Sequence, residues 1–375
     1  MNIKIMTKPA AEKKSVRLHL TNIAGLGAVQ LIQSLLPSFE QLPDYKVEAV
    51  YLPSKGELSN YEASCAETKL TYYKRYLPNS ISRLLECTLF GSKFDGASPL
   101  LVLGDIPLRS KATQAVFVQT PLLTQGAGTG MTLGAIKYWI ARSLFKLNST
   151  YVSAFIVQTV AMKAALVETY PEIIGRVHVI AQPAPKWLLE SQLKRTQRNS
   201  RAGSGLRLFY PAAVYPHKNH RLLSAIQADQ VSKWPISEVL LTIPENLNPN
   251  IALACLKCVD RLTPDKVIKA YEAADALLFL SLAESFGFPL VEAMWIGLPI
   301  ICPDRPYARS LCGDQAIYFD PESVASLQEA VIDLNKRLDS GWWPEWSENL
   351  KVIPKNWEEV ATAMLSLVTD SVKSA

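Results

Sequence analysis

Residues 274–304 read ADALLFLSLAESFGFPLVEAMWIGLPIICPD, and this stretch indicates how the second half of the chain folds. Its first seven residues are mostly apolar, which is typical of a buried parallel strand. A polar turn with a glycine follows. Pro289 suits the first turn of a helix, where its missing N–H costs nothing, and Gly297 suits the C-terminal cap. The pattern therefore predicts a strand, a loop, a helix and a second strand.

Short apolar runs alternate with helix-like stretches along the rest of the chain as well. This alternation is typical of βαβ units with parallel strands. The expected strands form two series, which are residues 3–6, 47–52, 100–103, 115–119, 154–157 and 177–181, and residues 206–210, 238–242, 276–280, 298–302 and 316–319.

Two series of strands predict an α/β protein with two Rossmann-like, doubly wound parallel-sheet domains. The polar, basic segment 194–205 lies between the series and reads as a linker or an exposed loop. We expect an N-terminal domain over residues 1–184, a linker over 185–205 and a C-terminal domain over 206–350. A last helix, within 351–375, is expected to pack back toward the first domain. The tryptophans of 341–346 either pack that end of the chain or stack on a sugar.

Composition excludes several classes of protein. Apolar residues make up 49% of the chain and charged residues 19%, so the chain is globular rather than disordered. No uncharged apolar run reaches the roughly 18–20 residues of a membrane span. Six cysteines in 375 residues are too few for a disulfide framework, and the first ten residues lack the apolar core of a secretory signal. We therefore expect a cytoplasmic protein.

Charge is distributed unevenly between the two halves. Residues 1–184 hold 19 Lys and Arg against 12 Asp and Glu, a net charge of +7, whereas the remainder holds 20 against 22, a net charge of −2. An anionic membrane surface, phosphate groups or nucleic acid would complement the basic half. The chain lacks the dense stripe of cations and aromatic residues that nucleic-acid binding requires, so no nucleic-acid partner is expected.

Two glutamates mark the edge of the second sheet. Glu284 lies in the turn after the strand at 276–280, and Glu292 lies on the following helix. In doubly wound sheets, ligands bind at the carboxyl ends of the strands, and a helix N-terminus there favours phosphate. One carboxylate can face a reacting sugar while the other accepts hydrogen bonds from a ribose diol.

The run ESFGFPLVEAM at 284–294, followed by GLPII at 297–301, resembles the donor-binding signature of family 4 glycosyltransferases, which are retaining enzymes of the "glycosyl transferases group 1" type. The resemblance implies a GT-B fold, with two domains facing across a cleft, and a nucleotide-diphospho-sugar as co-substrate. It implies transfer with retention, no cofactor and no metal. It assigns Glu284 to catalysis and these residues to donor binding: Ser285, Phe286, Gly287, Phe288 and Glu292.

A second matching block, LRLFYPAAVYPHKNHRL, occupies 206–222. The resemblance places Lys218 at the donor diphosphate as a catalytic cation, with His217 and Asn219 beside it in the donor site. Family members often carry an arginine five residues before that lysine, where this chain has Ala213. The pair His217 and His220 has no carboxylate or cysteine pattern nearby, so we do not expect a metal site.

In the first half, Gly25 and Gly27 precede an apolar helix expected over 28–36. They do not form a dinucleotide fingerprint, because Gln30 occupies the third glycine position. The resemblance places these glycines near the donor phosphates, and a purely structural turn is the alternative.

Val116–Pro121 ends a strand, and the resemblance places Gln119 near the reacting sugar, where family members often carry histidine. We therefore predict a catalytic position for Gln119 and acceptor contacts for Thr120 and Asp105. For Asp105 the alternative is a turn residue that caps a loop.

The segment 131–147 is amphipathic, with cations among aromatic residues, and the glycine-rich segment 125–134 before it suits an acceptor loop. Such a helix fits either a membrane interface or an ordinary protein surface. We expect peripheral contact of the basic N-terminal domain with the cytoplasmic face of the inner membrane.

The sequence thus predicts a retaining hexosyltransferase that acts on a glycan or lipid-linked acceptor in bacterial surface polysaccharide synthesis, such as O-antigen, lipopolysaccharide or capsule. Two alternatives stay open: a catalytically inactive accessory protein that binds sugar nucleotides, and a nicotinamide-dependent oxidoreductase. The residues do not single out a nucleotide base, a sugar or an acceptor.

Overall fold

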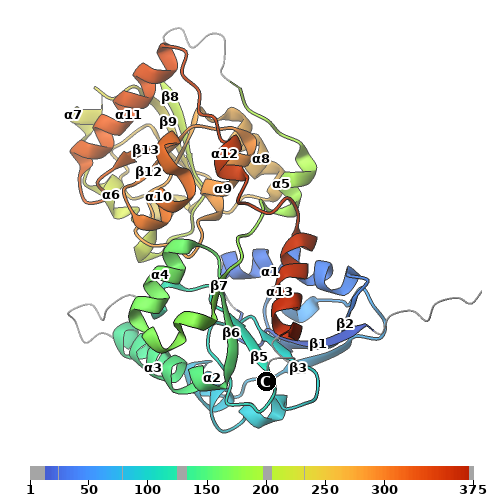
Figure 1. Cartoon of the computed structure of the whole chain (residues 1–375). Coiled ribbons are helices and arrows are strands. Elements are labelled where there is room, and N and C mark those ends of the chain that lie inside the picture. Colours follow the sequence, from blue (N-terminus) through green and yellow to red (C-terminus); the bar gives the residue numbers. More distant parts are fainter. Residues whose placement is uncertain are drawn as a thin grey trace, which may run out of the picture. The chain divides into compact units, whose positions relative to one another are not determined.

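The computed structural model describes residues 13–23, 25–77, 79–124, 133–196, 205–231 and 233–370 (Figure 1). The strand predicted at 3–6 lies outside these residues. The chain divides into two compact units. Unit 1 comprises Met1–Val157, Leu166–Ile180 and Trp357–Ala375, and unit 2 comprises Gln158–Ala165 and Ala181–Asn356.

Unit 1 contains a parallel seven-stranded sheet in the order β3-β2-β1-β4-β5-β6-β7. Because β1 and β4 lie at its centre, their carboxyl ends meet at the middle of one edge. The strands are β1 (Lys14–His19), β2 (Tyr45–Pro53), β3 (Lys69–Tyr73), β4 (Leu100–Val102), β5 (Gln114–Phe117), β6 (Val152–Val157) and β7 (Val177–Val179).

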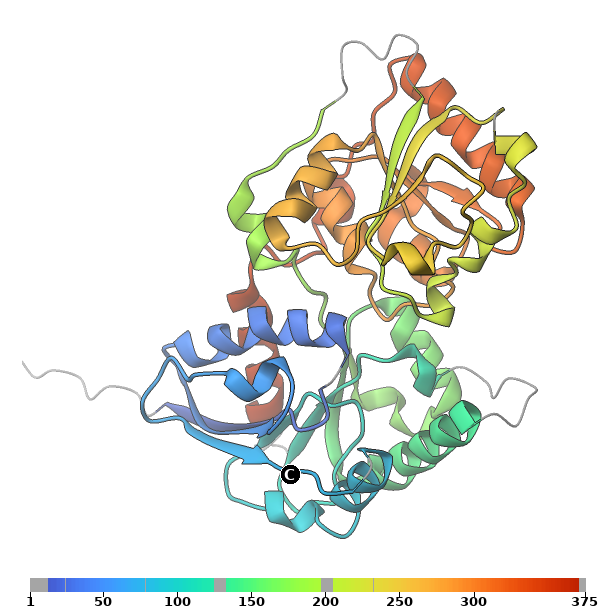
Figure 2. The same ribbon diagram turned by 180° about the vertical axis from the view of Figure 1, so that it is seen from behind.

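The helices of unit 1 include the last helix of the chain. This helix packs against α1 (Figures 1 and 2). The Tyr45 hydroxyl also lies 2.8 Å from Ser366 Oγ. Helix α13 therefore packs against the first sheet together with α1. The helices are α1 (Leu26–Gln41), α2 (Asn79–Cys87), α3 (Leu133–Asn148) and α13 (Trp357–Asp370), and α4 (Val160–Thr169) contributes to both units.

Unit 2 contains a parallel six-stranded sheet in the order β10-β9-β8-β11-β12-β13. Its strands are β8 (Leu206–Tyr210), β9 (Ile236–Leu241), β10 (Leu256–Cys258), β11 (Ala276–Leu278), β12 (Ile300–Pro303) and β13 (Ile317–Phe319). Its helices are α5 (Lys186–Ser191), α6 (Arg221–Ser224), α7 (Ala228–Val231), α8 (Pro264–Ala273), α9 (Phe288–Ile296), α10 (Pro306–Cys312), α11 (Val324–Asp339) and α12 (Ser347–Leu350).

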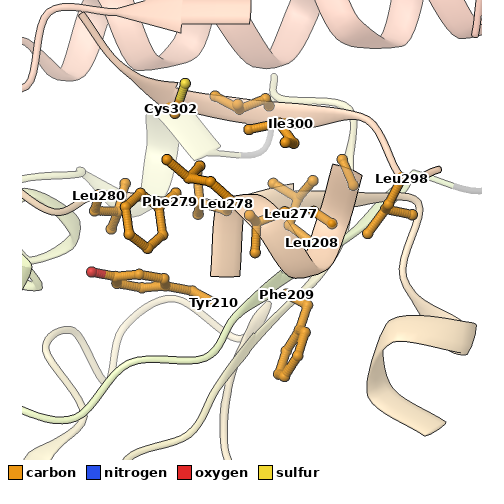
Figure 3. Close-up of a cluster of buried hydrophobic side chains, with 14 of the residues drawn as sticks. Leu208, Phe209, Tyr210, Leu277, Leu278, Phe279, Leu280, Leu298, Ile300 and Cys302 are labelled. Carbon is orange, nitrogen blue, oxygen red and sulfur yellow. The ribbon is translucent and has the colours of Figure 1, made fainter. Parts of the chain in front are cut away.

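Fully buried side chains of neighbouring strands form the core of unit 2 (Figure 3). Leu208 comes from β8, Leu277 from β11 and Ile300 from β12. Trp346 is also buried and donates a hydrogen bond from its indole nitrogen to the carbonyl of Leu298, at 3.0 Å. This contact favours the packing interpretation of the tryptophan-rich stretch.

The two parallel sheets predicted from the apolar runs are confirmed, but β1, β3 and β10 are absent from the predicted strands. The sequence of β1, KSVRLH, alternates polar and apolar residues although the strand is central. Arg17 is buried there because its guanidinium donates to the carbonyls of Phe94, at 2.9 Å, and Ser98, at 2.7 Å. A satisfied buried cation thus hides a core strand from a search for apolar runs. Within the described ranges, no helix is long and apolar enough to cross a membrane.

Candidate functional site

The strand–loop–helix–strand unit predicted for 274–304 is present as β11, a loop, α9 and β12. Gly287 begins α9 with φ of 86°, and Gly297 ends it with φ of 83°. A Cβ on Gly297 would also meet the carbonyl oxygen of Arg195 at 2.9 Å, so only glycine fits there. The two glycines fix where the helix starts and where the chain turns back into the sheet.

Lys218 and Glu284 are brought together at the carboxyl edge of the second sheet. They follow β8 and β11, which are neighbours, and Lys218 Nζ pairs with Glu284 Oε1. The side chains are 18% and 14% exposed. The Leu282 N–H donates to the carbonyl of His217, at 2.7 Å, and the Tyr210 hydroxyl donates to the carbonyl of Lys218, at 2.6 Å. The loop after β8 and the loop after β11 are therefore joined by a backbone hydrogen bond, which holds Lys218 and Glu284 near each other.

The remaining residues of the His217–His220 loop hold its shape. The ring of His217 stacks on Tyr215, and burial and then the nearby Lys218 lower the pKa of its imidazole. Asn219 is buried, and its side-chain amide donates to the carbonyl of Pro321, at 2.9 Å. Burial lowers the pKa of His220 to about 4, and Lys218 adds to this shift. Over the described parts of the chain, no three His, Cys, Asp or Glu side chains gather as metal ligands would.

The loop before α9 offers backbone rather than side-chain groups. Phe286 is buried and packs edge-on against Phe288, with 5.2 Å between ring centroids. The carbonyl of Ser285 accepts a hydrogen bond from Thr159 Oγ1, at 3.2 Å. Pro289 has no N–H, and the Leu290 N–H donates to the carbonyl of Gly287, at 2.9 Å. The groups at this end of α9 that suit an anion are therefore the N–H groups around Phe286 and Gly287 and that of Phe288.

Glu292 lies on the buried side of α9 and contacts Tyr271 of α8. The Tyr271 hydroxyl donates to Glu292 Oε2, at 2.6 Å. Burial raises the pKa of this carboxyl to about 7, and the tyrosine hydrogen bond opposes that shift. The carboxylate is therefore held where its charge is only partly compensated.

At the edge of the first sheet, Gly25 is the N-cap of α1 and Gly27 lies in its first turn. Both are exposed, and a Cβ at either position would meet open space. Gly25 has an ordinary extended backbone with φ of −76°. Within unit 1, neither position requires glycine for its own conformation.

Asp105, Gln119 and Thr120 come together at the ends of β4 and β5. Asp105 Oδ1 accepts the backbone N–H groups of Gln119, at 2.6 Å, and Thr120, at 3.0 Å. The Gln119 side-chain amide donates to the carbonyl of Leu103, at 2.8 Å. Asp105 has φ of 67°, which is uncommon for a residue with a side chain. These contacts favour the interpretation of Asp105 as a residue that caps a loop.

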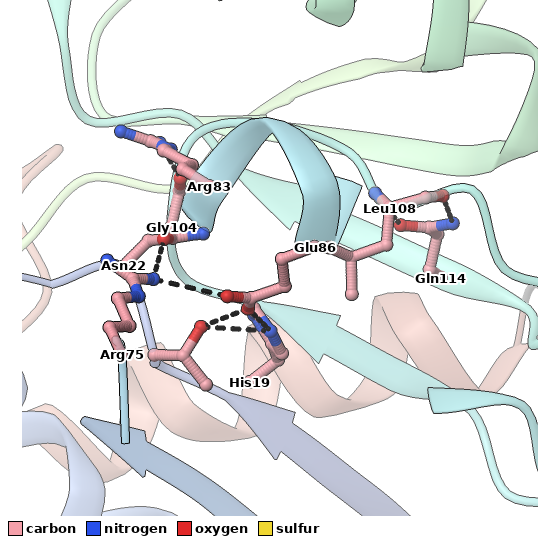
Figure 4. Close-up of polar contacts among 9 residues, drawn as sticks. His19, Asn22, Arg75, Arg83, Glu86, Gly104, Leu108 and Gln114 are labelled. Carbon is pink, nitrogen blue, oxygen red and sulfur yellow. Dashed lines mark hydrogen bonds and ion pairs between the residues drawn. The ribbon is translucent and has the colours of Figure 1, made fainter. Parts of the chain in front are cut away.

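Sequence analysis missed a cluster of charged side chains beside these loops (Figure 4). His19 Nε2 lies 2.7 Å from Glu86 Oε1, Thr21 donates to the same oxygen, and Arg75 pairs with Glu86 Oε2 at 3.2 Å. Burial by itself would raise the pKa of Glu86, but the hydrogen bonds from His19 and Thr21 and the charge of Arg75 lower it to about 2. Arg83 donates to the carbonyl of Gly104.

No motif links these residues, since His19 and Glu86 are 67 positions apart. The only signal in the sequence is a histidine at the end of an undetected strand. The cluster therefore exists only in the folded chain, where these distant segments meet.

The match to a known family lies within unit 2. Residues 256–338 match the family model described as "Glycosyl transferases group 1". A serotype-specific mannosyltransferase, WbdA of Escherichia coli, is 28% identical over 113 residues, which cover 28% of this chain and 14% of that protein. The O-antigen chain mannosyltransferase RfbU of Salmonella typhimurium is 33% identical over 139 residues, which cover 34% of this chain and 38% of that protein. The chain thus matches well under half the length of either relative, and the matches support a glycosyltransferase.

The fold is similar to that of solved glycosyltransferase structures over almost the whole chain. Sucrose-phosphate synthase from Thermosynechococcus elongatus aligns with a TM-score of 0.65 and 14% identity, covering 97% of this chain and 100% of that one. A likeness at this identity concerns the fold alone. The GT-B fold class, with two Rossmann-like domains, is thereby confirmed.

Proposed function

We propose that the protein is a retaining, metal-independent glycosyltransferase that moves a hexosyl unit from a nucleotide-diphospho-sugar to a glycan or lipid-linked acceptor. One observation carries the proposal: the Lys218–Glu284 pair lies at the carboxyl edge of the second sheet, and Glu284 lies in the loop that leads into α9. A cation, a carboxylate and the N–H groups of a loop at a helix N-terminus are what a diphospho-sugar requires at that edge.

Lys218 and the N–H groups around Phe286 and Gly287, just before α9, would bind the donor diphosphate. In the free protein Lys218 is paired with Glu284, so its charge is held in place before the donor arrives. When the diphosphate departs, its negative charge grows, and prepositioned donors stabilise that state more than the bound substrate. This neutralisation by the chain's own groups is the reason for proposing that no metal is required.

Glu284 would contact the donor sugar, and Glu292 would accept hydrogen bonds from the ribose. Retention requires no protein base in this scheme, because a donor phosphate oxygen can take the acceptor proton. Gln119 is neutral and would act as a hydrogen-bonding group only. Its side-chain N–H already donates to Leu103, which leaves its amide oxygen as the available acceptor.

The names of the relatives support a proposal for the biological process. Their names state mannosyl transfer and O-antigen chains, so we propose bacterial surface polysaccharide synthesis at the cytoplasmic face of the membrane, with mannosyl as the first sugar to test. A catalytically inactive protein that binds sugar nucleotides is the second candidate, and Ala213, in place of a second cation before Lys218, favours it.

A thermal-shift panel with UDP, GDP and their sugar conjugates tests the donor site. A ligand that binds only the folded protein raises Tm with its affinity, so one nucleotide is expected to raise it. Lys218→Met should abolish the shift, while Lys266→Met, at an exposed position on α8, should keep it. If no nucleotide changes Tm, the donor-site assignment is wrong.

If a donor binds but wild type transfers no sugar to any acceptor, the inactive candidate is supported. Transfer that stops in a chelator and returns with a divalent cation would overturn metal independence.

A further inference from the structure

Unit 1 exposes an unusual number of large apolar side chains along α2 and α3. Tyr76 is 84% exposed, Leu89 72%, Trp139 64% and Leu147 62%. Surface apolar residues are normally scattered, and a group of this size marks an interaction site. We define the α2–α3 face by these exposed apolar residues of the two helices and the turns beside them: Tyr76, Leu77, Ile81, Leu89, Phe90, Trp139 and Leu147.

The segments that carry these residues lie beside each other, because α2 and α3 are packed together. The Asn148 side chain, at the end of α3, donates to the carbonyl of Cys87, the last residue of α2, at 2.8 Å. The helices also lie beside each other in Figure 1. Leu147 therefore lies near the turn that follows α2, where Leu89 and Phe90 are exposed.

Charge is concentrated on the same segments. Residues 74–94 and 133–151 hold seven Lys and Arg and a single acid, Glu86, a net charge of +6 out of the +7 of residues 1–184. Glu86 is buried and pairs with Arg75, so these two charges cancel and the net charge of +6 comes from the other six cations of the two segments. Lys93 Nζ lies 4.5 Å from the ring centroid of Phe90, and Lys74 Nζ lies 5.2 Å from that of Tyr76.

We infer that the α2–α3 face docks on an anionic phospholipid surface. Aromatic and aliphatic side chains with lysines beside them match the boundary between headgroups and acyl chains, where the rings insert and the ammonium groups meet phosphates. A second copy of the chain fits less well, because two faces of the same high positive charge would repel each other. The inference extends the proposed function, whose acceptor class includes lipid-linked glycans, but its test uses neither donor nor acceptor.

Co-sedimentation with vesicles tests this surface directly. The full chain is expected to bind vesicles of phosphatidylcholine mixed with phosphatidylglycerol, to bind phosphatidylcholine alone weakly, and to dissociate as NaCl is raised. The double variant Leu89→Ser with Trp139→Ser should lower the partition coefficient by about tenfold or more. Its control is Ile251→Ser, an 87% exposed isoleucine of unit 2 that should leave binding unchanged.

A second pair of variants separates charge from insertion. Lys93→Glu with Lys146→Glu should lower binding to anionic vesicles by about tenfold, whereas Lys257→Glu with Lys266→Glu, also at exposed positions, should change it little. Equal Tm values for variants and wild type show that folding is intact. The inference is overturned if wild type binds neither vesicle, if both pairs of variants act alike, or if light scattering finds a dimer that Leu89→Ser dissociates. Loss of vesicle binding with intact donor binding leaves the proposed function standing.

Discussion

Glu86 of unit 1 and Glu292 of unit 2 are both buried, 8% and 7% exposed, yet their pKa values move in opposite directions. Glu86 receives hydrogen bonds from His19 and Thr21 and the charge of Arg75, which overcome burial and lower its pKa to about 2. Glu292 is raised to about 7 by burial, and Tyr271 offsets only part of that shift. The number of compensating partners decides the direction.

The difference separates two uses of a buried carboxylate. A carboxylate whose oxygens are already occupied stabilises the fold around it, as Glu86 does for the edge of the first sheet. A carboxylate that burial penalises gains most from a ligand that brings hydroxyl donors. Glu292 therefore fits a ligand-binding role better than Glu86, although both lie close to the carboxyl edges of their sheets.

The largest expected effect is the loss of stability on removing the compensated charge. Glu86→Gln leaves the Arg75 guanidinium and the His19 ring without their anion and should lower the free energy of unfolding by about 3–5 kcal/mol. Urea unfolding at pH 7 measures it. Glu238→Gln breaks the exposed pair with Arg207 and should cost no more than about 1 kcal/mol. Equal costs for the two variants would contradict a compensated buried charge.

The pH dependence of stability should separate the same two glutamates. Glu86 has a pKa of about 2 in the folded state against an ordinary value of 4.5, so its stabilising contribution is present above pH 4.5 and is lost as pH falls toward 2. Glu292 has a folded-state pKa of about 7 against the same 4.5, so it lowers stability as pH rises from 4.5 to 7. Each contribution is on the order of 3 kcal/mol.

Unfolding free energies measured from pH 3 to pH 8 check both signs. Glu86→Gln should flatten the acid limb, and Glu292→Gln should make the protein more stable at pH 8 than wild type while changing little at pH 4. If Glu292→Gln instead lowers the free energy of unfolding at pH 8, then groups besides Tyr271 stabilise the charged form of Glu292.

Glu284 is expected to give the largest loss of transfer. Glu284→Gln keeps the shape of the side chain but removes the charge that faces Lys218, and it should reduce sugar transfer on the order of 100-fold. Donor binding should persist, because Lys218 remains. Glu245→Gln, at an exposed position in unit 2, is the matched control and should leave transfer unchanged. Transfer by Glu284→Gln within about threefold of wild type would remove Glu284 from the proposed mechanism.

The sequence predicted the local structure and the site residues better at the second sheet than at the first. At the second sheet, Glu284, Gly287 and Gly297 lie within one run of residues, so local spacing predicted α9 and its caps. At the first sheet, His19 and Glu86 meet only because distant segments pack together. The strand that carries His19 also escaped prediction, since Arg17 interrupts its apolar pattern.

The roles of the residues after β4 and β5 were also predicted only in part. The pattern of residues placed Asp105, Gln119 and Thr120 after predicted strands and left loop capping as the alternative for Asp105. It did not show that the capped groups are the two backbone N–H groups that follow β5. Asp105 also has a φ of 67°, which the sequence analysis did not predict.

The smallest expected effect tests whether Glu292 binds the ligand. Glu292→Gln retains a hydrogen-bond acceptor for the ribose hydroxyls but loses the charge, so donor affinity should fall by about tenfold. Titration calorimetry with the nucleotide found in the thermal-shift panel measures the change in Kd. Glu86→Gln serves as the comparison and should leave Kd unchanged wherever the variant is folded. If Glu86→Gln weakens donor binding as much as Glu292→Gln does, then the compensation of a buried carboxylate does not distinguish a ligand-binding glutamate from a structural one.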